Sequence, residues 1–387
     1  NSASATSFGP ISTNGAFTFN TGGTVTQTGA LSATTVDLLG SGGSYTLNNA
    51  GNTILSLTSS TGTGSISFTN STVLNLGPVT TTGGLNVTSS GTLTVEDMVN
   101  FGGVSSLTAV AGNVVVNRAI KRTGSATASL ALTATTGSVS IDATTGSIAP
   151  DTGAAAFGVS ILAGTGNITL GGAVSTGGGA LTLDTTGTAS QTAAFTAGAL
   201  TLQGGGTFTL GTAANMFTSL ATGTANTASI NLRNTGTTTS FGAISTGALT
   251  FTTGGTVSQT GGLTATSANL LGTGGTYNLT GTGNMVGTLT STTGTGSISL
   301  VNTSMAATSV GPVTTTGSLN VTSGGDLSVI DAISFGDGAS SLVSNTGNVT
   351  VGAAINRTGT GAASLALTAN TATKGVSITT GTGSIGA

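Results

Sequence analysis

Residues 112–116 read Gly-Asn-Val-Val-Val, a turn pair followed by β-branched residues. The phrase returns as Gly-Ser-Val-Ser-Ile at 137–141, Gly-Asn-Ile-Thr-Leu at 166–170 and Gly-Asn-Val-Thr-Val at 347–351. Apolar residues at alternate positions predict a short strand with one buried face. The leading Gly-Asn or Gly-Ser predicts the turn that opens each strand.

Two other short sequence patterns recur along the chain together with the first. One is an alternating apolar pair, as in Leu-Asn-Val at 85–87 and Leu-Thr-Leu at 181–183. The other is a single apolar residue, and its copies are spaced by 20, 21, 28 and 26 residues at Val79, Val99, Ile120, Ile148 and Val174. About three short strands per coil of roughly 20–28 residues predict an all-β fold, a parallel β-helix or β-solenoid.

A much larger repeat contains these phrases. Phe-Gly-Pro-Ile-Ser-Thr at 8–13 returns as Phe-Gly-Ala-Ile-Ser-Thr at 241–246, and the offset between matched residues runs from 232 (62 to 294) to 237 (148 to 385). We expect one continuous solenoid over 1–387, with copy one at 8–240 and a partial copy two at 241–387. Since no initiator Met or signal peptide begins the chain, we expect a mature product or an excised segment, with further copies outside it.

The composition agrees with stacked coils. Charged residues make up 4% of the chain and aromatic residues 4%, while Gly alone numbers 66. Stacking places like side chains ~4.8 Å apart, where like charges repel but Thr, Ser and Asn are tolerated. The regular apolar pairs argue against disorder. The sequence contains no run of 18 apolar residues, so it predicts no membrane-spanning helix.

The sequence offers little for catalysis. It has no His and no Cys, which removes the commonest zinc ligands, thiol nucleophiles and the Ser-His-Asp triad. The acidic clusters are Glu96/Asp97 and Asp326/Asp331/Asp337, of which only Asp97 and Asp331 match between the copies. We interpret both as solvated corners and expect no enzyme activity, catalytic residue, cofactor or metal site. Six basic residues against nine acidic ones predict no nucleic-acid binding.

One polar feature occurs in both copies, at Arg122 and Arg357. Aligning neighbouring coils on their single apolar residues places Phe101 beside Arg122 and Phe335 beside Arg357. We expect each guanidinium within ~6 Å of its ring, where it would stabilise the corner by roughly 0.5–1 kcal/mol if the contact is exposed. The four residues are therefore predicted as structural, and the alternative is a carbohydrate-contacting spot.

The coils as a whole resemble a known group of proteins. Tandem Gly/Thr/Ser/Asn-rich phrases, such as Thr-Gly-Asn-Ile-Thr at 165–169 and Thr-Gly-Ala-Leu-Thr at 246–250, are similar to filamentous-haemagglutinin-like bacterial surface exoproteins of the two-partner secretion type. The resemblance covers the whole chain and rests on composition and coil periodicity. It implies a right-handed parallel β-helix, export to the cell surface, and roles in adhesion, aggregation or biofilm formation. The Asn-Pro-Asn motifs of that family's secretion domain are absent.

Two function classes follow. The first is an extracellular structural or adhesive fibre protein, secreted to the cell surface. It would self-associate by end-to-end stacking or by further repeats of a longer chain, with a host or matrix glycan as a further partner. The alternative is a glycan- or ice-binding solenoid that uses Thr-rich faces, suggested by the Thr runs 80–82 and 314–316.

Overall fold

The computed structural model describes residues 4–304 and 307–386. These residues form parallel strands stacked coil upon coil, and no helix occurs among them. The predicted all-β solenoid is confirmed. The chain divides into two compact units, Asn1–Leu200 and Thr201–Ala387, so the boundary between the units differs from the 240/241 boundary between the sequence copies. A single continuous solenoid stays a prediction.

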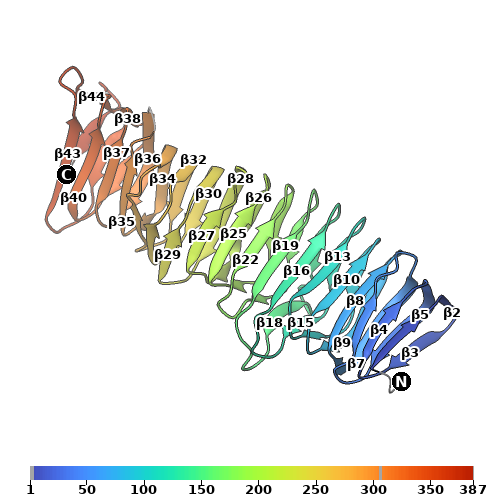
Figure 1. The fold of residues 1–387 in the computed structure, drawn as a ribbon. Coiled ribbons are helices and arrows are strands. Elements are labelled where there is room, and N and C mark those ends of the chain that lie inside the picture. Colours follow the sequence, from blue (N-terminus) through green and yellow to red (C-terminus); the bar gives the residue numbers. More distant parts are fainter. Residues whose placement is uncertain (1–3, 305–306, 387) are drawn as a thin grey trace. The chain divides into compact units, whose positions relative to one another are not determined.

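The strands fall into two parallel sheets, A and B (Figure 1). In the first unit, the sheet A strands are β1 (Ala5–Phe8), β4 (Thr24–Gln27), β6 (Ser44–Leu47), β8 (Ser65–Asn70), β10 (Leu85–Ser89), β13 (Ser105–Ala109), β16 (Ser129–Ala134), β19 (Gly158–Leu162) and β22 (Leu181–Asp184). Its sheet B strands are β2 (Ile11–Ser12), β3 (Ala16–Asn20), β5 (Leu31–Leu39), β7 (Thr53–Thr63), β9 (Leu74–Thr81), β11 (Leu93–Val95), β12 (Val99–Phe101), β14 (Val114–Val116), β15 (Ala119–Arg122), β17 (Val139–Ile141), β18 (Ser147–Pro150), β20 (Ile168–Leu170), β21 (Val174–Ser175), β23 (Thr188–Gln191) and β24 (Phe195–Thr196).

The second unit has the same organisation, and β25 (Ala199–Gln203) spans the division. Its sheet A strands are β27 (Ser219–Thr222), β29 (Thr238–Phe241), β31 (Thr256–Gln259), β33 (Thr276–Leu279), β35 (Ser297–Asn302), β37 (Leu319–Ser323), β40 (Gly338–Ser344) and β43 (Ala363–Ala369). Its sheet B strands are β26 (Thr207–Asn215), β28 (Thr227–Asn234), β30 (Ile244–Thr252), β32 (Leu263–Leu271), β34 (Met285–Thr295), β36 (Ala307–Thr315), β38 (Asp326–Val329), β39 (Ile333–Phe335), β41 (Val349–Val351), β42 (Ala354–Arg357), β44 (Val376–Ile378) and β45 (Ser384–Gly386).

The register confirms the coil period predicted from the single apolar residues. Val79 pairs with Val99, Val99 with Ile120, Ile120 with Ile148, and Ile148 with Val174. Each of the five is buried. Parallel pairing holds these residues in one column because a one-residue slip would turn every inward side chain outward.

The number of strands per coil varies along the chain. Coils such as β10–β12 have three strands, as predicted, whereas β4–β5 or β29–β30 make a coil of two. The difference lies in sheet B, where β5 is one strand of nine residues. In coils such as β10–β12, residues 96–98 interrupt this sheet, so two short strands replace one long strand.

The core is a stack of inward apolar side chains. Leu107 pairs with Leu132, Leu132 with Ile161, and Ile161 with Leu183, and all four are almost fully buried. Burying each such side chain contributes about 1.5–3 kcal/mol.

Glycine is required where a corner closes against the preceding coil. Gly40 has a φ of 108°, and a Cβ there would lie 2.0 Å from the Thr21 carbonyl oxygen. Its counterpart Gly272 has a φ of 113° and the same 2.0 Å clash with the Thr253 carbonyl oxygen. Only glycine adopts this conformation at so close an approach, so the corner is built identically in both copies.

A buried tyrosine anchors the same corner. The Tyr277 hydroxyl donates to the Phe251 carbonyl at 2.9 Å and the Leu271 carbonyl at 2.5 Å. Its counterpart Tyr45 donates to the Leu39 carbonyl and to another carbonyl of sheet B. Burial raises the pKa of both phenols above its ordinary value, because the charged phenolate would lose its hydration.

This shift predicts alkaline sensitivity. Tyrosine in the unfolded chain ionises near pH ~10, whereas folded Tyr277 stays neutral to higher pH. Above that pH the unfolded state therefore binds fewer protons, and the free energy of unfolding falls as pH rises. We expect Tyr277→Phe to lower the free energy of unfolding by about 1 kcal/mol at pH 8, because a hydrogen bond is missing. Between pH 8 and 11, the free energy of unfolding of this variant should fall less than that of the unchanged protein. Urea unfolding between pH 8 and 11 measures both, and an equally steep decline in Tyr277→Phe would contradict the assignment.

Candidate functional site

The four residues predicted as structural occupy matching places in the two copies. Phe101 in β12 pairs with Arg122 in β15, and Phe335 in β39 pairs with Arg357 in β42. The alignment that placed each arginine one coil after a phenylalanine agrees with this register. The distance between guanidinium and ring stays a prediction.

The surroundings of Arg122 are those of the core and not of an exposed corner. Arg122 and Phe101 are both fully buried, because each shares inward parity with the core residue two positions before it. The Phe101 ring makes an edge contact with Phe157, at 5.8 Å between centroids. A guanidinium that solvent does not reach cannot contact a dissolved sugar, so Arg122 is not a surface carbohydrate spot.

Arg122 holds the loop that follows it. Its Nη2 donates to the Ala126 carbonyl, while Nε and Nη1 are buried without a hydrogen-bond partner. The nearby acid Asp151 lies 3.6 Å from Lys121 Nζ, in a pair that is half exposed. Arg122 is thus a buried cation with one carbonyl acceptor, an arrangement that costs stability unless packing compensates.

Arg357 repeats the loop anchor with one addition. Its Nη2 donates to the Gly361 carbonyl and lies 3.6 Å from Asp337 Oδ1, which also accepts a hydrogen bond from the Gly361 amide at 2.7 Å. Copy one has Gly103 at the position of Asp337. Arg357 is partly exposed, so this carboxylate pair contributes little, about 0.2–1 kcal/mol.

The two arginines predict different responses to the same substitution. Arg122→Met removes two unpartnered buried donors and keeps most of the volume, so we expect the free energy of unfolding to stay the same or to rise. Arg357→Met removes an ion pair and should lower it by about 0.2–1 kcal/mol. Urea unfolding of both variants measures the difference. A loss above about 3 kcal/mol in Arg122→Met would mean that the charge is needed.

The acidic clusters act as turn caps. Asp97 Oδ1 accepts from the Met98 amide and Asp331 Oδ1 from the Ala332 amide, both at 2.7 Å. Asp326 Oδ1 accepts from the Asn348 amide at 2.7 Å. At another corner, hydrogen bonds from Thr144 and Thr145 lower the pKa of the Asp142 carboxyl far below its usual range. Across residues 4–304 and 307–386, no group of three or more His, Cys, Asp or Glu could hold a metal ion.

The Thr runs do not form continuous faces. Thr81 and Thr315 point into the core, and only their neighbours in each run reach the surface. A regular ladder of hydroxyl and amide side chains lies elsewhere, on the outer side of sheet A. In the second unit its pairs stand in register over four coils: Thr238/Ser240, Thr256/Ser258, Thr276/Asn278 and Ser297/Ser299.

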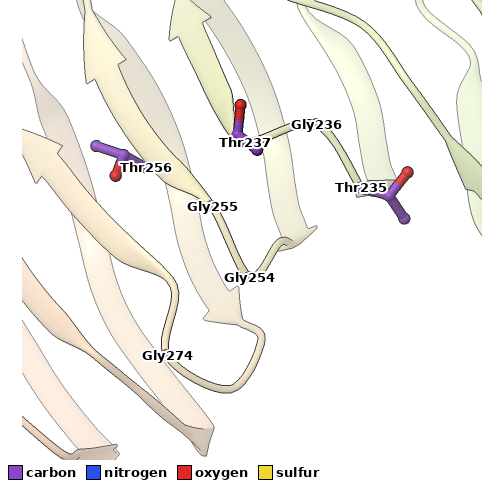
Figure 2. A pocket seen from close by; sticks show the side chains of 7 residues that line it. All are labelled: Thr235, Gly236, Thr237, Gly254, Gly255, Thr256 and Gly274. Carbon is purple, nitrogen blue, oxygen red and sulfur yellow. The ribbon is translucent and has the colours of Figure 1, made fainter.

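A groove borders this ladder at the corners of the second unit. Figure 2 shows Thr235, Thr237 and Thr256 projecting around the bare bends at Gly236 and 254–255. Its cavity volume is about 330 Å³. A second hollow of about 520 Å³ shares Thr235 and adds the exposed Arg233. Glycines open the space, because each corner lacks a side chain that would fill it.

Arg233 is notable for its isolation. It is the only charged residue between Asp184 and Asp326. Thr252 lies one coil after it in the same outward column, and Gly211 lines the same hollow. Sequence reasoning missed this groove because its residues come from coils about 20 residues apart.

A family model described as Repeats of unknown function (DUF5649) matches residues 1–61 and 63–119. The chain is a repeat protein. The matched stretches hold the coils from β1 to β14, so the repeats that this model describes are solenoid coils here. No curated protein and no solved structure matches the chain. The filamentous-haemagglutinin-like assignment stays a prediction, and no helix in the described ranges is long and apolar enough to cross a membrane.

Proposed function

We propose that this repeat protein is an extracellular structural or adhesive fibre protein, whose stacked coils support surface attachment, aggregation or matrix formation. The observation that carries the proposal is that each unit builds coil upon coil in parallel register, so that added coils lengthen the stack. Solenoids use such extended surfaces for contact with partners.

The polar chemistry of the surface supports a non-enzymatic role. The carboxylates of Asp97 and Asp331 cap turns, and that of Asp326 accepts a hydrogen bond from the Asn348 amide of the next coil. The sequence contains no His or Cys to act as base or nucleophile. The outward side chains of sheet A are mostly small hydroxyls and amides, which suit many weak contacts with a hydrated matrix.

Surface display tests the proposal. Cells that display the full chain should aggregate and attach to a solid surface more than cells that display a variant with Val114→Asp and Val139→Asp. These substitutions place charge in two neighbouring inward positions and disrupt the stack. Equal attachment at equal display level would overturn the adhesive role. Electron microscopy of the native material shows separately whether it forms filaments.

The groove around Arg233 favours glycan binding as a second candidate. A lone guanidinium beside Thr hydroxyls and bare backbone suits a sugar carboxylate. A glucuronate-containing oligosaccharide should bind the full chain more tightly than its carboxyl-reduced neutral form, and Arg233→Ala should remove the difference. Arg118→Ala, which changes another exposed arginine, is the matched control. Equal binding of the two sugars would exclude this candidate.

A further inference from the structure

Arg122 is a buried cation that has no counter-charge from the protein. The residue is 0% exposed, and its Nε and Nη1 are buried without a hydrogen-bond partner. No ion pair of Arg122 occurs in the part of the chain that the structure describes. Buried charges in folded proteins are normally paired, and an unpartnered buried donor commonly marks the place of a water or an ion.

In copy two, a carboxylate supplies the counter-charge. Asp337 Oδ1 lies 3.6 Å from Arg357 Nη2 and accepts a hydrogen bond from the Gly361 amide at 2.7 Å. Arg357 Nη2 also donates to the Gly361 carbonyl, as Arg122 Nη2 does to the Ala126 carbonyl. The arginine and the loop after it are thus alike in both copies, and the carboxylate is present in one of them.

A local difference in sequence explains why copy one lacks this carboxylate. Gly102 and Gly336 are counterparts, since a Cβ there would lie 2.1 Å and 1.8 Å from a threonine carbonyl oxygen of the preceding coil. Ser105 and Ser340 are counterparts too, because each hydroxyl accepts a hydrogen bond at 3.0 Å from the amide of the leucine that begins β10 or β37. Between Gly102 and Ser105 the chain reads Gly-Val, whereas between Gly336 and Ser340 it reads Asp-Gly-Ala.

We propose that Arg122 binds a small monovalent anion of the size of chloride, which supplies the negative charge that Asp337 supplies in copy two. The unpartnered Nη1 and Nε are the donors available to it, and binding needs only one of them. A hydrogen bond from a guanidinium to an anion is among the stronger ones in proteins, and it would offset the burial of the charge. The site goes beyond the proposed fibre role and does not depend on it.

The loop that follows Arg122 is the way in for the anion. Residues 124–127 are exposed, and Gly124 bends the loop with a φ of 83°. Since the Ala126 carbonyl contacts Arg122 Nη2, opening of this loop uncovers the guanidinium. Exposed loops open at a small cost in free energy. An ion of one atom needs a far smaller opening than a sugar, so the burial that excludes a carbohydrate here still admits chloride.

Urea unfolding of the full chain in sodium chloride and in sodium gluconate of equal ionic strength tests the site. Gluconate is the reference because it is too large for a site that the protein encloses. We expect chloride raised from ~5 to ~500 mM to lower the unfolding equilibrium constant of the first unit ~10-fold more than gluconate does, because an anion that binds only the folded state shifts the equilibrium by mass action. The effect should saturate.

Three variants assign the effect to Arg122. Arg122→Met should show no difference between the two salts, and in gluconate it should be at least as stable as the unchanged chain. A chain whose residues 103–104 are replaced by the sequence of 337–339 carries its own carboxylate and should also show no difference. Gly103→Asp alone is unsuitable, because its Cβ would lie 2.9 Å from a backbone nitrogen of the preceding coil. Arg118→Met, which changes an exposed arginine of the same coil, should keep the full difference.

A second measurement does not depend on how the variants fold. Crystals of the unchanged chain grown in sodium bromide should show an anomalous peak within ~3.5 Å of Arg122 Nη1 or Nε, the distance of a hydrogen bond to a large anion. A guanidinium without bromide would overturn the proposal and assign the unpartnered donors to ordered water. Equal stability in chloride and gluconate, or the same chloride response in Arg122→Met, would overturn it as well.

Discussion

Asn52→Leu is expected to lower the free energy of unfolding of the first unit by about 3–5 kcal/mol, because it leaves several buried polar groups without a hydrogen-bond partner. Asn52 is fully buried. Its Oδ1 accepts from the Leu31 amide at 2.8 Å, and its Nδ2 donates to the Leu47 and Thr69 carbonyls at 3.0 Å each. It also exchanges two hydrogen bonds of 2.9 Å with Gln27. Urea unfolding, with exchange at the Leu31 amide as a local probe, measures the loss.

The chain provides matched controls for this substitution. Asn48 is exposed, and its side chain exchanges hydrogen bonds with Ser67, so Asn48→Leu should lower the free energy of unfolding by less than about 0.5 kcal/mol. Asn284 repeats the network with Gln259 in the second unit, where Asn284→Leu should cost as much as Asn52→Leu. A loss below about 1 kcal/mol at Asn52 would show that the network adds little.

Phe251→Ala is expected to lower the free energy of unfolding of the second unit by about 3–5 kcal/mol. The Phe251 ring is fully buried and makes edge contacts with two other rings. The distances between ring centroids are 4.9 Å to Phe241 and 6.4 Å to Tyr277. Removing it leaves a cavity among rings that strand pairing holds in place. Urea or thermal unfolding of the variant measures the effect.

Phe19 is the counterpart of Phe251 in copy one and makes the matched control. It keeps the edge contact to a tyrosine, 6.1 Å from Tyr45, but it lies in the first coil and is partly exposed. Phe19→Ala should therefore lower the free energy of unfolding by about half as much as Phe251→Ala. Equal losses at the two sites would mean that the covering coil adds nothing to the burial of the ring.

Most of the fold could be predicted from the chain because its signals are local. Alternation of apolar residues defines each strand, and the spacing of Val79, Val99 and Ile120 defines the coil that brings them into register. A parallel stack permits no other alignment without turning the core outward. The sequence pattern did not predict whether a coil has one or two strands in sheet B, since this depends on how each corner packs.

The sequence by itself determined the strands, their period, the internal duplication and the pairing of Phe101 with Arg122, because each follows from patterns within one or two coils. Only the tertiary structure decided that Asn52 closes a polar network and that Arg233 stands in a groove. Those properties depend on side chains in coils about 20 residues away, whose distance and burial no local pattern encodes.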